Sequence, residues 1–565
     1  MVDHPGDIAD SPVKTLGTGE LGGKARGLSL ISETLKNEFN HKAFPQVHVD
    51  IPPMTVLLTG CFCQFMELND LHAFVRNETN ERAIASRFLK CCLPVSILGP
   101  LYAYAGQCHT PLAIRSSSLF EDQLHIPLAG VYGTKIIPNN QLDTETRFAK
   151  IMEAVKFVYA TVYFPEARDY FAGVGLDIYK EQMAVIIQEL VGSRHGDRFY
   201  PNISGVARSY HFYPSGNAVP GDGVVSLAAG LGKTIVDGGS TWTYSPRYPK
   251  APPPYNSVGD LLSNTQQNFW AVNMSGAYGY DPTKEAEYLV ENPVKIVEAD
   301  GVHHDLVSTW DHRNDCFYEG GYSQGGRVYN FAPLLKSETL PINAIIQELL
   351  TLSEKHEGRE VEIEFAAAWD PDRGNARVGF LQVRPMNVTT SFVDLADHED
   401  KPLVFSSHQA MGNGVITGLS DVVFVKREGF DRLKTRTMEK DIAAINRTLR
   451  EENRHCVLLG FGRWGSSDPS LGIPATWGEI SQARVILEAS LDSMNADMSQ
   501  GSHFFHNLCA LGIHYHSIGS ADTLDWEYLH NCHTITETEH VLHVRSERPL
   551  TSVIDGRLHK GIVTR

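Results

Sequence analysis

The chain has 565 residues and a mass of 62.6 kDa, which predicts roughly three or four folding units at about 150 residues each. Hydrophobic residues make up 42% and charged residues 21%, which is typical of a folded globular protein and excludes a disordered, fibrous or small disulfide-stapled chain. The net charge of −18 would repel a phosphate backbone, so we expect neither nucleic acid nor an anionic membrane surface as a partner.

The N-terminus and the cysteines bear on where the protein works. The first residues, MVDHPGDIAD, are acidic and lack the apolar run of a signal peptide. The nine cysteines are scattered and form no C-x-x-C pair, so we expect free thiols in a reducing compartment and no disulfide framework. We therefore expect a cytoplasmic protein.

Helical and strand patterns alternate along the whole chain. The segments with helical periodicity are 25–39, 144–162, 341–355 and 439–454. The segments with strand character are 183–191, 223–228, 361–367, 377–384, 422–425 and 484–488. This mixture predicts an α/β or α+β class. The proline-rich stretch 245–256 predicts a surface loop, and the polar stretch 389–402 predicts the main domain boundary.

The first chemical motif is the glycine-rich sequence GTGELGGKARGL at 17–28. Glycines let backbone N–H groups approach an anion, the following helix adds its positive end, and Lys24 adds a full charge. The motif is not a Walker A loop, because Thr18 and Ala25 stand where that loop needs Gly and Ser or Thr. A phosphate site and a simple turn that caps a helix are both open interpretations.

The second motif, PLAIRSSSLFED at 111–122, is an apolar strand that ends at Arg115 and three serines. A guanidinium is a planar fork of five donors that fits phosphate oxygens. The serine hydroxyls can add further donors. An ordinary strand end with turn residues explains the same sequence equally well.

The third motif, VEIEFAAAWDPDRGNARVGFLQVRP at 361–385, reads as a β-hairpin around the turn cluster PDRGN. If the hairpin is symmetric about Arg373, Glu364 faces Gln382 and Glu362 faces Arg384. Two oxygen donors side by side suit Mg²⁺, and the neighbouring Arg384 suits a phosphate. An amphipathic hairpin with a cross-strand Glu362–Arg384 pair is the alternative, and a one-residue slip in register would separate the pairs.

Together these motifs resemble the nucleotide-binding domain of the pyruvate phosphate dikinase and phosphoenolpyruvate synthase family. The resemblance covers roughly residues 15–390. Its further segments, in the order of the family, are PLAGVYGT (127–134), MAVIIQELV (183–191), SGVARS (204–209) and AAGLGKTIVDGG (228–239). One departure is Lys233, which stands where the family often has Glu after G-L-G.

The resemblance implies a two-lobed ATP-grasp domain, with an N-terminal lobe at 1–182 and a C-terminal lobe at 183–392. It also implies ATP and Mg²⁺ as cofactors and a set of site residues. Lys24 and Arg115 would hold ATP phosphates, and the strand end at Gln188, Glu189 and Val191 would form the hinge against adenine. Glu364 and Gln382 would hold Mg²⁺, and Arg384 would contact the transferred phosphate.

Residues 402–565 resemble the family's smaller, swivelling α/β domain, which carries a phosphorylated histidine. The segment GSHFFHNLCALGI at 501–513 resembles the family's Gly-rich turn, Thr-Ser-His and helix, and it makes His503 the candidate phosphate carrier. A histidine at a helix N-terminus is placed for backbone N–H groups to stabilise an attached phosphate. The segment departs from the pattern because Gly501 replaces Thr and phenylalanines replace small residues. A helix-capping segment is the alternative interpretation.

The last 65 residues contain nine of the 24 histidines. A transition-metal site is one interpretation of this density, and scattered surface histidines are the more common outcome. The family's barrel of about 250 residues for phosphoenolpyruvate or pyruvate is not expected in this chain.

We therefore expect an ATP-binding phosphotransferase of the dikinase type. It would pass a phosphoryl group from Mg-ATP, by way of His503, to an unidentified small-molecule or protein acceptor, with Arg384 and Arg115 assisting the transfer. Two alternatives remain open: an ATP-binding sensor without a phosphoenzyme, and an ATP-grasp ligase that activates a carboxylate.

Overall fold

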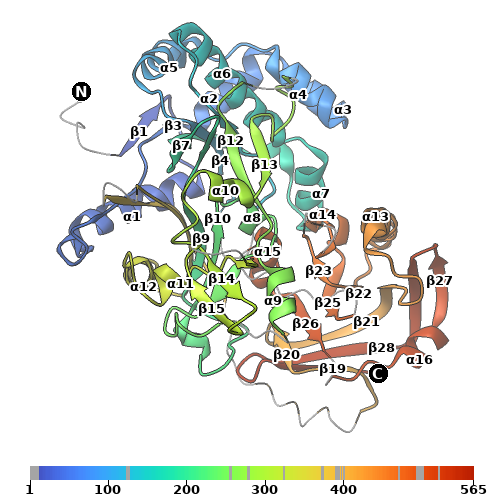
Figure 1. Cartoon of the computed structure of the whole chain (residues 1–565). Coiled ribbons are helices and arrows are strands. Elements are labelled where there is room, and N and C mark those ends of the chain that lie inside the picture. The colour runs from blue at the N-terminus through green and yellow to red at the C-terminus, as the bar shows by residue number, and fades with distance from the viewer. Residues whose placement is uncertain are drawn as a thin grey trace.

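The structure is a computed structural model. It describes residues 12–121, 128–252, 257–276, 280–321, 325–370, 375–388, 393, 395, 398, 401–466, 468, 471–491, 502–519 and 522–565. Most of the predicted turn 371–375, the prolines of the predicted loop at 253–254 and Gly501 lie outside these residues. Figure 1 shows a larger body, blue to yellow, with an orange-to-red C-terminal unit packed against it. The fold is a mixed α/β fold, as the sequence predicts.

The first sheet has five strands, and buried β6 lies at its centre. Its order is β1 (Val13–Leu16), β3 (Met54–Leu57), β6 (Met183–Glu189), β4 (Leu112–Ser118) and β5 (Lys135–Ile137). Its helices are α2 (Thr59–Leu68), α3 (Leu71–Asn77), α4 (Glu81–Leu89), α5 (Val95–Gln107), α6 (Thr144–Thr161) and α7 (Pro165–Gly173). The six consecutive apolar and amide residues of β6 are fully buried, because helices and neighbouring strands cover both faces.

The second sheet has six strands and takes its edge from the N-terminal part of the chain. Its order is β11 (Trp242–Tyr244), β10 (Val224–Ala229), β9 (Ile203–Arg208), β17 (Val361–Trp369), β18 (Ala376–Pro385) and β2 (Val47–Asp50). Strand β2 pairs in parallel with β18. Arg377 fixes the pairing by donating to Asp50 at 2.8 and 3.0 Å. The helices α1 (Gly23–Glu38) and α12 (Ile342–Glu357) pack together beside this sheet.

Two small sheets and short helices complete the body. One small sheet has four strands in the order β13 (Leu289–Pro293), β12 (Asn268–Asn273), β8 (Arg198–Tyr200) and β7 (Ser193–His195). The other has three strands in the order β15 (Cys316–Glu319), β14 (Ser308–Asp311) and β16 (Arg327–Val328). The helices are α8 (Lys233–Val236), α9 (Val258–Asn264), α10 (Lys295–Ala299) and α11 (Ala332–Leu335). The expected lobe boundary at 182/183 falls just before β6, which pairs with β3 and β4 of the first sheet. The lobe limits remain our proposal.

The predicted hairpin register is present at the site end of β17 and β18. Glu362 lies opposite Arg384, and Glu364 lies opposite Gln382. A β-bulge between Glu364 and Phe365 then shifts the remaining pairs by one residue. A bulge absorbs one extra residue on one strand, so the symmetry about Arg373 holds only on one side of it.

The C-terminal unit is built on a nine-stranded mixed sheet. Its order is β19 (Leu403–Ser407), β29 (Lys560–Thr564), β28 (Val541–Asp555), β21 (Gly414–Val425), β22 (Cys456–Phe461), β25 (Ala483–Ala489), β26 (His514–Ile518), β20 (Gln409–Met411), with β27 (His533–Glu537) beside β28. Strands β21, β22, β25 and β26 are parallel neighbours. The other elements are β23 (Arg463–Trp464), β24 (Gly472–Ile473), α13 (Thr435–Glu451), α14 (Trp477–Ile480), α15 (His503–Ala510) and α16 (Trp526–Asn531).

The C-terminal unit is docked closely on the body. Helix α14 packs against α7, and a Cβ at Gly478 would lie 2.7 Å from the Cβ of Asp169, so only glycine allows this approach. Phe505 of α15 contacts aromatic rings of the body at 5.9 and 6.1 Å between centroids. The buried hydrophobic cluster runs without a break from the first sheet into the C-terminal sheet. The interface between the body and the C-terminal unit is therefore largely apolar.

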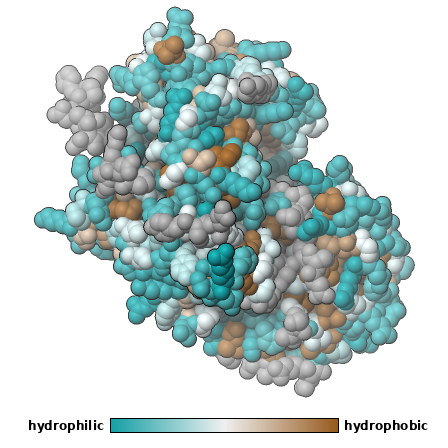
Figure 2. Space-filling view, in the orientation of Figure 1, coloured by the Kyte–Doolittle hydropathy of each residue, from teal (hydrophilic) through white to brown (hydrophobic). Residues whose placement is uncertain are grey.

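The surface agrees with the composition. The face in Figure 2 is mostly hydrophilic, and its hydrophobic residues form small separate patches. The most exposed large hydrophobic side chains, Leu142, Leu433 and Val95, come from separate parts of the chain.

Among the described residues, none of the helices combines the length and the apolar character required to cross a bilayer. The cysteines at 61, 63, 91, 92, 108, 316, 456 and 532 are free thiols.

Buried His514 predicts an acid-sensitive C-terminal unit. Burial lowers the pKa of His514 to about 4, so the folded state keeps it neutral while the unfolded state takes up a proton below about pH 6.5. The unfolded state binds more protons between these values, so stability is complete above pH 6.5 and is lost towards pH 4. We expect His514 to account for about 3 kcal/mol of this loss.

Urea unfolding of the wild type and of His514→Gln at several pH values between 7 and 4.5 measures this contribution. The variant should show a shallower loss of stability with acid. Equal pH slopes for the two proteins would show that His514 titrates alike in the folded and unfolded states.

Candidate functional site

The glycine-rich loop is fixed against β4 by a close backbone approach. Gly22 has φ of 74°, and a Cβ there would lie 1.8 Å from the carbonyl oxygen of Ser117, so the position requires glycine. The Ser117 hydroxyl donates to the carbonyl of Leu21 at 2.8 Å and accepts from the amide of Ala25 at 3.0 Å. These contacts place the start of α1, and with it Lys24, beside the second motif.

Lys24 is buried and points to the serine run. Its Nζ lies 3.2 Å from the Ser116 hydroxyl and forms an ion pair with Glu121. Glu121 also accepts from the amide of Ser118 at 3.1 Å. The lysine of the first motif and the serines of the second therefore form one cluster. Glu121 was not among the predicted site residues, although it lies within the quoted motif.

Arg115 connects the two large sheets. One guanidinium nitrogen donates to the Leu381 carbonyl at 2.9 Å and to the Gln188 side chain at 3.3 Å. The other donates to Gln382 at 2.8 Å and lies 3.5 Å from Glu364. Arg115 of β4 thus contacts β6, β17 and β18 at once, and the structure brings three other predicted site residues together around its side chain.

Glu364 and Arg384 form the charged floor of this cluster. Oε1 of Glu364 lies 3.1 Å from Arg384 Nη1. Burial alone would raise the pKa of Glu364, but the charges of Arg384 and Arg115 and the contact with His503 outweigh it and hold the pKa below its usual value. The carboxylate is therefore ionised throughout the physiological range.

A second carboxylate, Glu362, lies deeper on the same strand face. Its carboxylate accepts from Nε of Arg208 at 2.6 Å and lies 2.5 Å from Nη2 of the same side chain. Nη1 of Arg384 lies 3.2 Å from it, and Nδ1 of His506 lies 3.4 Å from it. Burial favours its neutral form, yet the neighbouring positive groups hold the pKa of Glu362 well below its usual value. The cross-strand Glu362–Arg384 pair of the amphipathic-hairpin interpretation is therefore present beside the predicted Glu364–Gln382 pair.

His503 is the first residue of α15 and lies at the edge of the same cluster. The Ser502 hydroxyl accepts from the amide of Phe505 at 3.2 Å and caps the helix. The imidazole lies against Gly130, where a Cβ would be 2.7 Å from His503 Nδ1. Its Nε2 is 3.9 Å from Oε1 of Glu364. Burial lowers the pKa of His503, and Glu364 offsets this only in part, so the imidazole is neutral at pH 7.

The predicted hinge residues have different environments. Gln188 is buried and its amide oxygen faces Arg115. Glu189 is half-buried at the end of β6. Val191 is buried and packs with Ala366, Ala368 and Leu381 of the second sheet. The strand end therefore joins the two sheets beside the Arg115 cluster.

The oxygen donors at Glu364 and Gln382 fit a magnesium ion. Oε1 of Glu364 is buried and lies 3.1 Å from Arg384 Nη1, but it meets no hydrogen-bond donor of good geometry among the described residues, so it retains accepting capacity. Carboxylate and amide oxygens are the ligands that hard cations prefer. Nowhere in the described ranges, this cluster and the described histidines of the C-terminal unit included, do three His, Cys, Asp or Glu side chains gather as they do around a metal ion.

The geometry agrees with a comparison of the sequence with known families. The model of the pyruvate phosphate dikinase AMP/ATP-binding domain matches residues 18–402, which is more than half of the 565-residue chain. This chain belongs to that family. No curated protein shows significant similarity to it. Its matched region is a two-lobed α/β domain of ATP-grasp type, and the family consists of ATP-using enzymes of the phosphotransferase class.

The dikinase-family match ends at residue 402, so it does not include His503 or His506. Sequence reasoning did not assign roles to Glu121, Arg208 and His506. Glu121 could have been found as the acidic residue nearest the serine run. Arg208 and His506 lie within the quoted segments SGVARS and GSHFFHNLCALGI, but their pairing with Glu362 could not be predicted because Glu362 is distant in the sequence.

The two phosphate candidates give a direct test of the nucleotide site. We expect Lys24→Ala and Arg115→Ala each to weaken ATP binding about tenfold, or about 1.4 kcal/mol, because each removes one positive charge from the cluster. Isothermal titration calorimetry with ATP and Mg²⁺ measures the change. Exposed Lys14 on β1 provides the control Lys14→Ala. Unchanged ATP affinity in both site variants would contradict the assignment.

Proposed function

We propose that this protein transfers a phosphoryl group from Mg-ATP to His503 and then to a second acceptor. The observation that carries the proposal is the position of His503, whose Nε2 lies 3.9 Å from Oε1 of Glu364. A histidine from the C-terminal unit thus lies beside the residues that we assign to the nucleotide. Membership of the dikinase family supports the ATP-using part of this proposal.

The nucleotide roles follow the cluster around Arg115. Lys24 and Arg115 bind the phosphates of ATP, and Gln188, Glu189 and Val191 border the adenine. Arg384 contacts the phosphoryl group that is transferred. Three positive side chains around a triphosphate stabilise the charge that develops during transfer, and this is the main way proteins catalyse such reactions.

Glu364 and Gln382 hold Mg²⁺ in this proposal. The ion, when bound, neutralises charge on the phosphate oxygens. Arg115 donates to Gln382 at 2.8 Å and lies 3.5 Å from Glu364, so the same guanidinium orients both oxygen donors.

His503 acts as the nucleophile. A neutral imidazole has a free lone pair, and burial favours that form here. Nε2 forms a bond to the β-phosphorus as the bond to AMP breaks. Water then releases the γ-phosphate, and the remaining phosphoryl group passes to the acceptor. The balance is ATP, water and acceptor on one side, and AMP, phosphate and phosphorylated acceptor on the other.

Radioactive labelling tests the proposal. The protein is incubated with Mg²⁺ and ATP labelled at the β- or the γ-phosphate, and the protein-bound phosphate is tested for stability in acid and base. We expect β-label that is acid-labile and base-stable, with AMP as the nucleotide product. ADP as the product, or no bound label, would contradict a dikinase-type transfer.

The contrary outcomes separate the two other functions that the sequence leaves open. ATP binding without turnover indicates a sensor. Turnover to ADP that depends on an added carboxylate indicates an ATP-grasp ligase. A cytoplasmic location, inferred from the scattered thiols, remains part of the proposal.

A further inference from the structure

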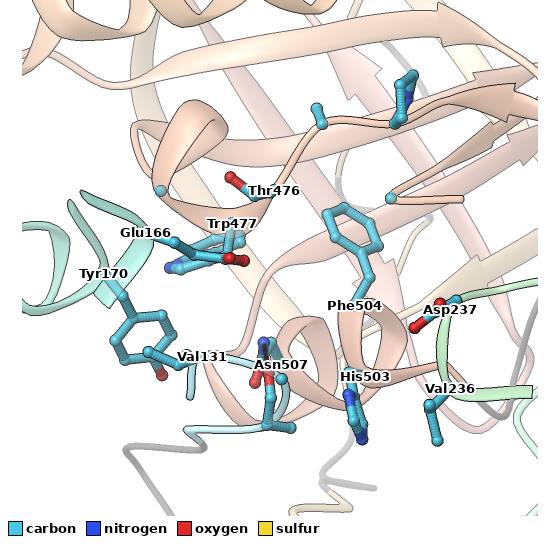
Figure 3. A pocket seen from close by; sticks show the side chains of 16 residues that line it. Val131, Glu166, Tyr170, Val236, Asp237, Thr476, Trp477, His503, Phe504 and Asn507 are labelled. Carbon is cyan, nitrogen blue, oxygen red and sulfur yellow. Dashed lines mark hydrogen bonds between the residues drawn. The ribbon is translucent and has the colours of Figure 1, made fainter. Parts of the chain in front are cut away.

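A cavity adjoins His503 on the side of the C-terminal unit. It has a volume of about 200 Å³ and lies between the body and the docked unit. We call it the Trp477 cleft, and it is lined by Glu166, Tyr170, Asp237, Trp477, His503 and Asn507, among others. Figure 3 shows that these side chains come from both parts of the molecule. Lys24, Arg115 and Glu364 are not among its lining residues.

Two buried polar side chains in this cleft are incompletely satisfied. Trp477 is 6% exposed and Asn507 is 3% exposed. The indole Nε1 of Trp477 and the Oδ1 of Asn507 find no hydrogen-bond partner among the described residues. Asn507 Nδ2 donates to the carbonyl of Ala129 at 3.0 Å, which fixes the amide so that its oxygen is the free atom. Buried polar atoms normally have partners, so each of these two atoms would gain a hydrogen bond from a ligand that reached it.

The charge of the cleft selects a cation. Glu166 reaches the cleft from the first turn of α7, and Glu285, Glu479 and Asp237 act on it electrostatically. The Glu166 side chain is itself exposed. Desolvation and these neighbouring acids raise its pKa, so an ammonium group beside it would favour its ionised form. Lys233 is paired with Asp237 at 2.7 Å and does not cancel this acidic excess. These acids disfavour an anionic ligand in the cleft and would stabilise a positively charged group near Glu166.

The aromatic rings and the size of the cleft further restrict the kind of ligand that fits. Trp477 and Tyr170 both line it, and aromatic faces attract ammonium groups. A volume of about 200 Å³ is below the range of about 300–1,000 Å³ that is usual for drug-sized ligands. The ligand is therefore smaller than a typical drug-sized molecule.

We propose that the Trp477 cleft binds the phosphoryl acceptor and that this acceptor is a small amino alcohol. Its ammonium group lies near Glu166 and the aromatic rings. Its hydroxyl group faces His503 and Asn507, which lie one turn apart on α15. The binding part of this proposal stands on the cleft, whereas the acceptor part rests on the proposed phosphotransferase function.

The position of His503 gives the transfer step. The same imidazole lines the cleft and lies 3.9 Å from Glu364, so it borders both sites. The hydroxyl oxygen of the amino alcohol forms a bond to the phosphorus on His503 as the nitrogen–phosphorus bond breaks. The electron pair of that bond returns to the imidazole, which takes up the hydroxyl proton.

Binding is tested with ethanolamine and choline by isothermal titration calorimetry and saturation-transfer NMR on the full chain. Ethylene glycol, which lacks the ammonium group, and ethylamine, which lacks the hydroxyl group, are the matched control compounds. We expect saturable binding of at least one amino alcohol and at least tenfold weaker binding of ethylene glycol. Glu166→Gln should weaken binding about tenfold, and Trp477→Phe should weaken it while the aromatic face is kept. Glu33→Gln, an exposed position on α1, is the control variant.

A labelled phosphoenzyme separates this proposal from the proposed function. If the amino alcohol binds and also discharges the label as its phosphate ester, both stand. If His503 is labelled but neither probe binds or discharges it, the cleft proposal is overturned and the phosphoenzyme remains. If the probes bind but no phosphoenzyme forms, the acceptor role is overturned together with the proposed function. Equal affinity of Glu166→Gln and wild type would overturn the assignment of the ammonium site.

Discussion

Replacing His503 by alanine is expected to reduce the ATP-derived phosphate on the protein by at least about 100-fold, to background. The imidazole is the only nucleophilic side chain that we assign to the transfer, and alanine cannot form the nitrogen–phosphorus bond. His503 lies at the first position of α15, and its side chain contacts Gly130 and approaches Glu364. The helix itself is capped by Ser502, so the variant should fold.

The measurement is β-label bound to protein after incubation with Mg-ATP, with ATP affinity determined in parallel. His503→Ala should keep ATP binding and lose the label. His533→Ala is the matched control, because His533 is an exposed histidine on β27 in the same unit. Label on His503→Ala at the wild-type level would place the phosphate elsewhere and remove the central residue of the proposed function.

The second large effect concerns stability. We expect Glu362→Ala to lower the free energy of unfolding by about 3–5 kcal/mol. The side chains of Glu362, Arg208 and Arg384 are each no more than 3% exposed. Removing the carboxylate leaves the buried guanidinium of Arg208 without its counter-charge and leaves Arg384 with Glu364. The cost of a buried unpaired charge exceeds that of a lost hydrogen bond.

Urea unfolding followed by tryptophan fluorescence measures this loss. Glu20→Ala is the control, because the Glu20–Arg26 pair is more than half exposed on both sides and exposed pairs contribute only about 0–1 kcal/mol. A double variant, Glu362→Leu with Arg208→Met, should recover part of the loss by removing one unpaired charge. A Glu362→Ala protein as stable as the control would show that solvent reaches the two arginines.

Local alternation in the sequence was sufficient to predict the hairpin that carries the site. The pairing of Glu362 with Arg384 and of Glu364 with Gln382 follows from the period of two in a strand and a turn of known length. The bulge at Glu364/Phe365 was not predicted, since nothing in the alternation marks where one strand takes an extra residue. The cluster of Lys24 and Arg115 with this hairpin was expected from family resemblance and not from spacing.

The remaining site residues depend on contacts between distant parts of the chain. Arg208 and Glu362 are 154 residues apart, and Arg115 and Gln382 are 267 apart. Strand β2 joins the second sheet although its neighbour β18 lies far along the chain. Such pairings arise from tertiary packing, so no single segment carries their signal. His506 illustrates this, because only the docking of α15 brings it to Glu362.

The hydrogen bonds of Arg115 have a consequence for nucleotide entry. In this structure the guanidinium already uses acceptors from three strands of two sheets, namely β6, β17 and β18. An incoming triphosphate must compete with these internal acceptors, so the observed affinity is the difference between two sets of bonds. The same exchange releases Gln382 and Gln188 from Arg115. Nucleotide occupancy and the closeness of the two sheets are then thermodynamically linked, and each influences the other by the same free energy.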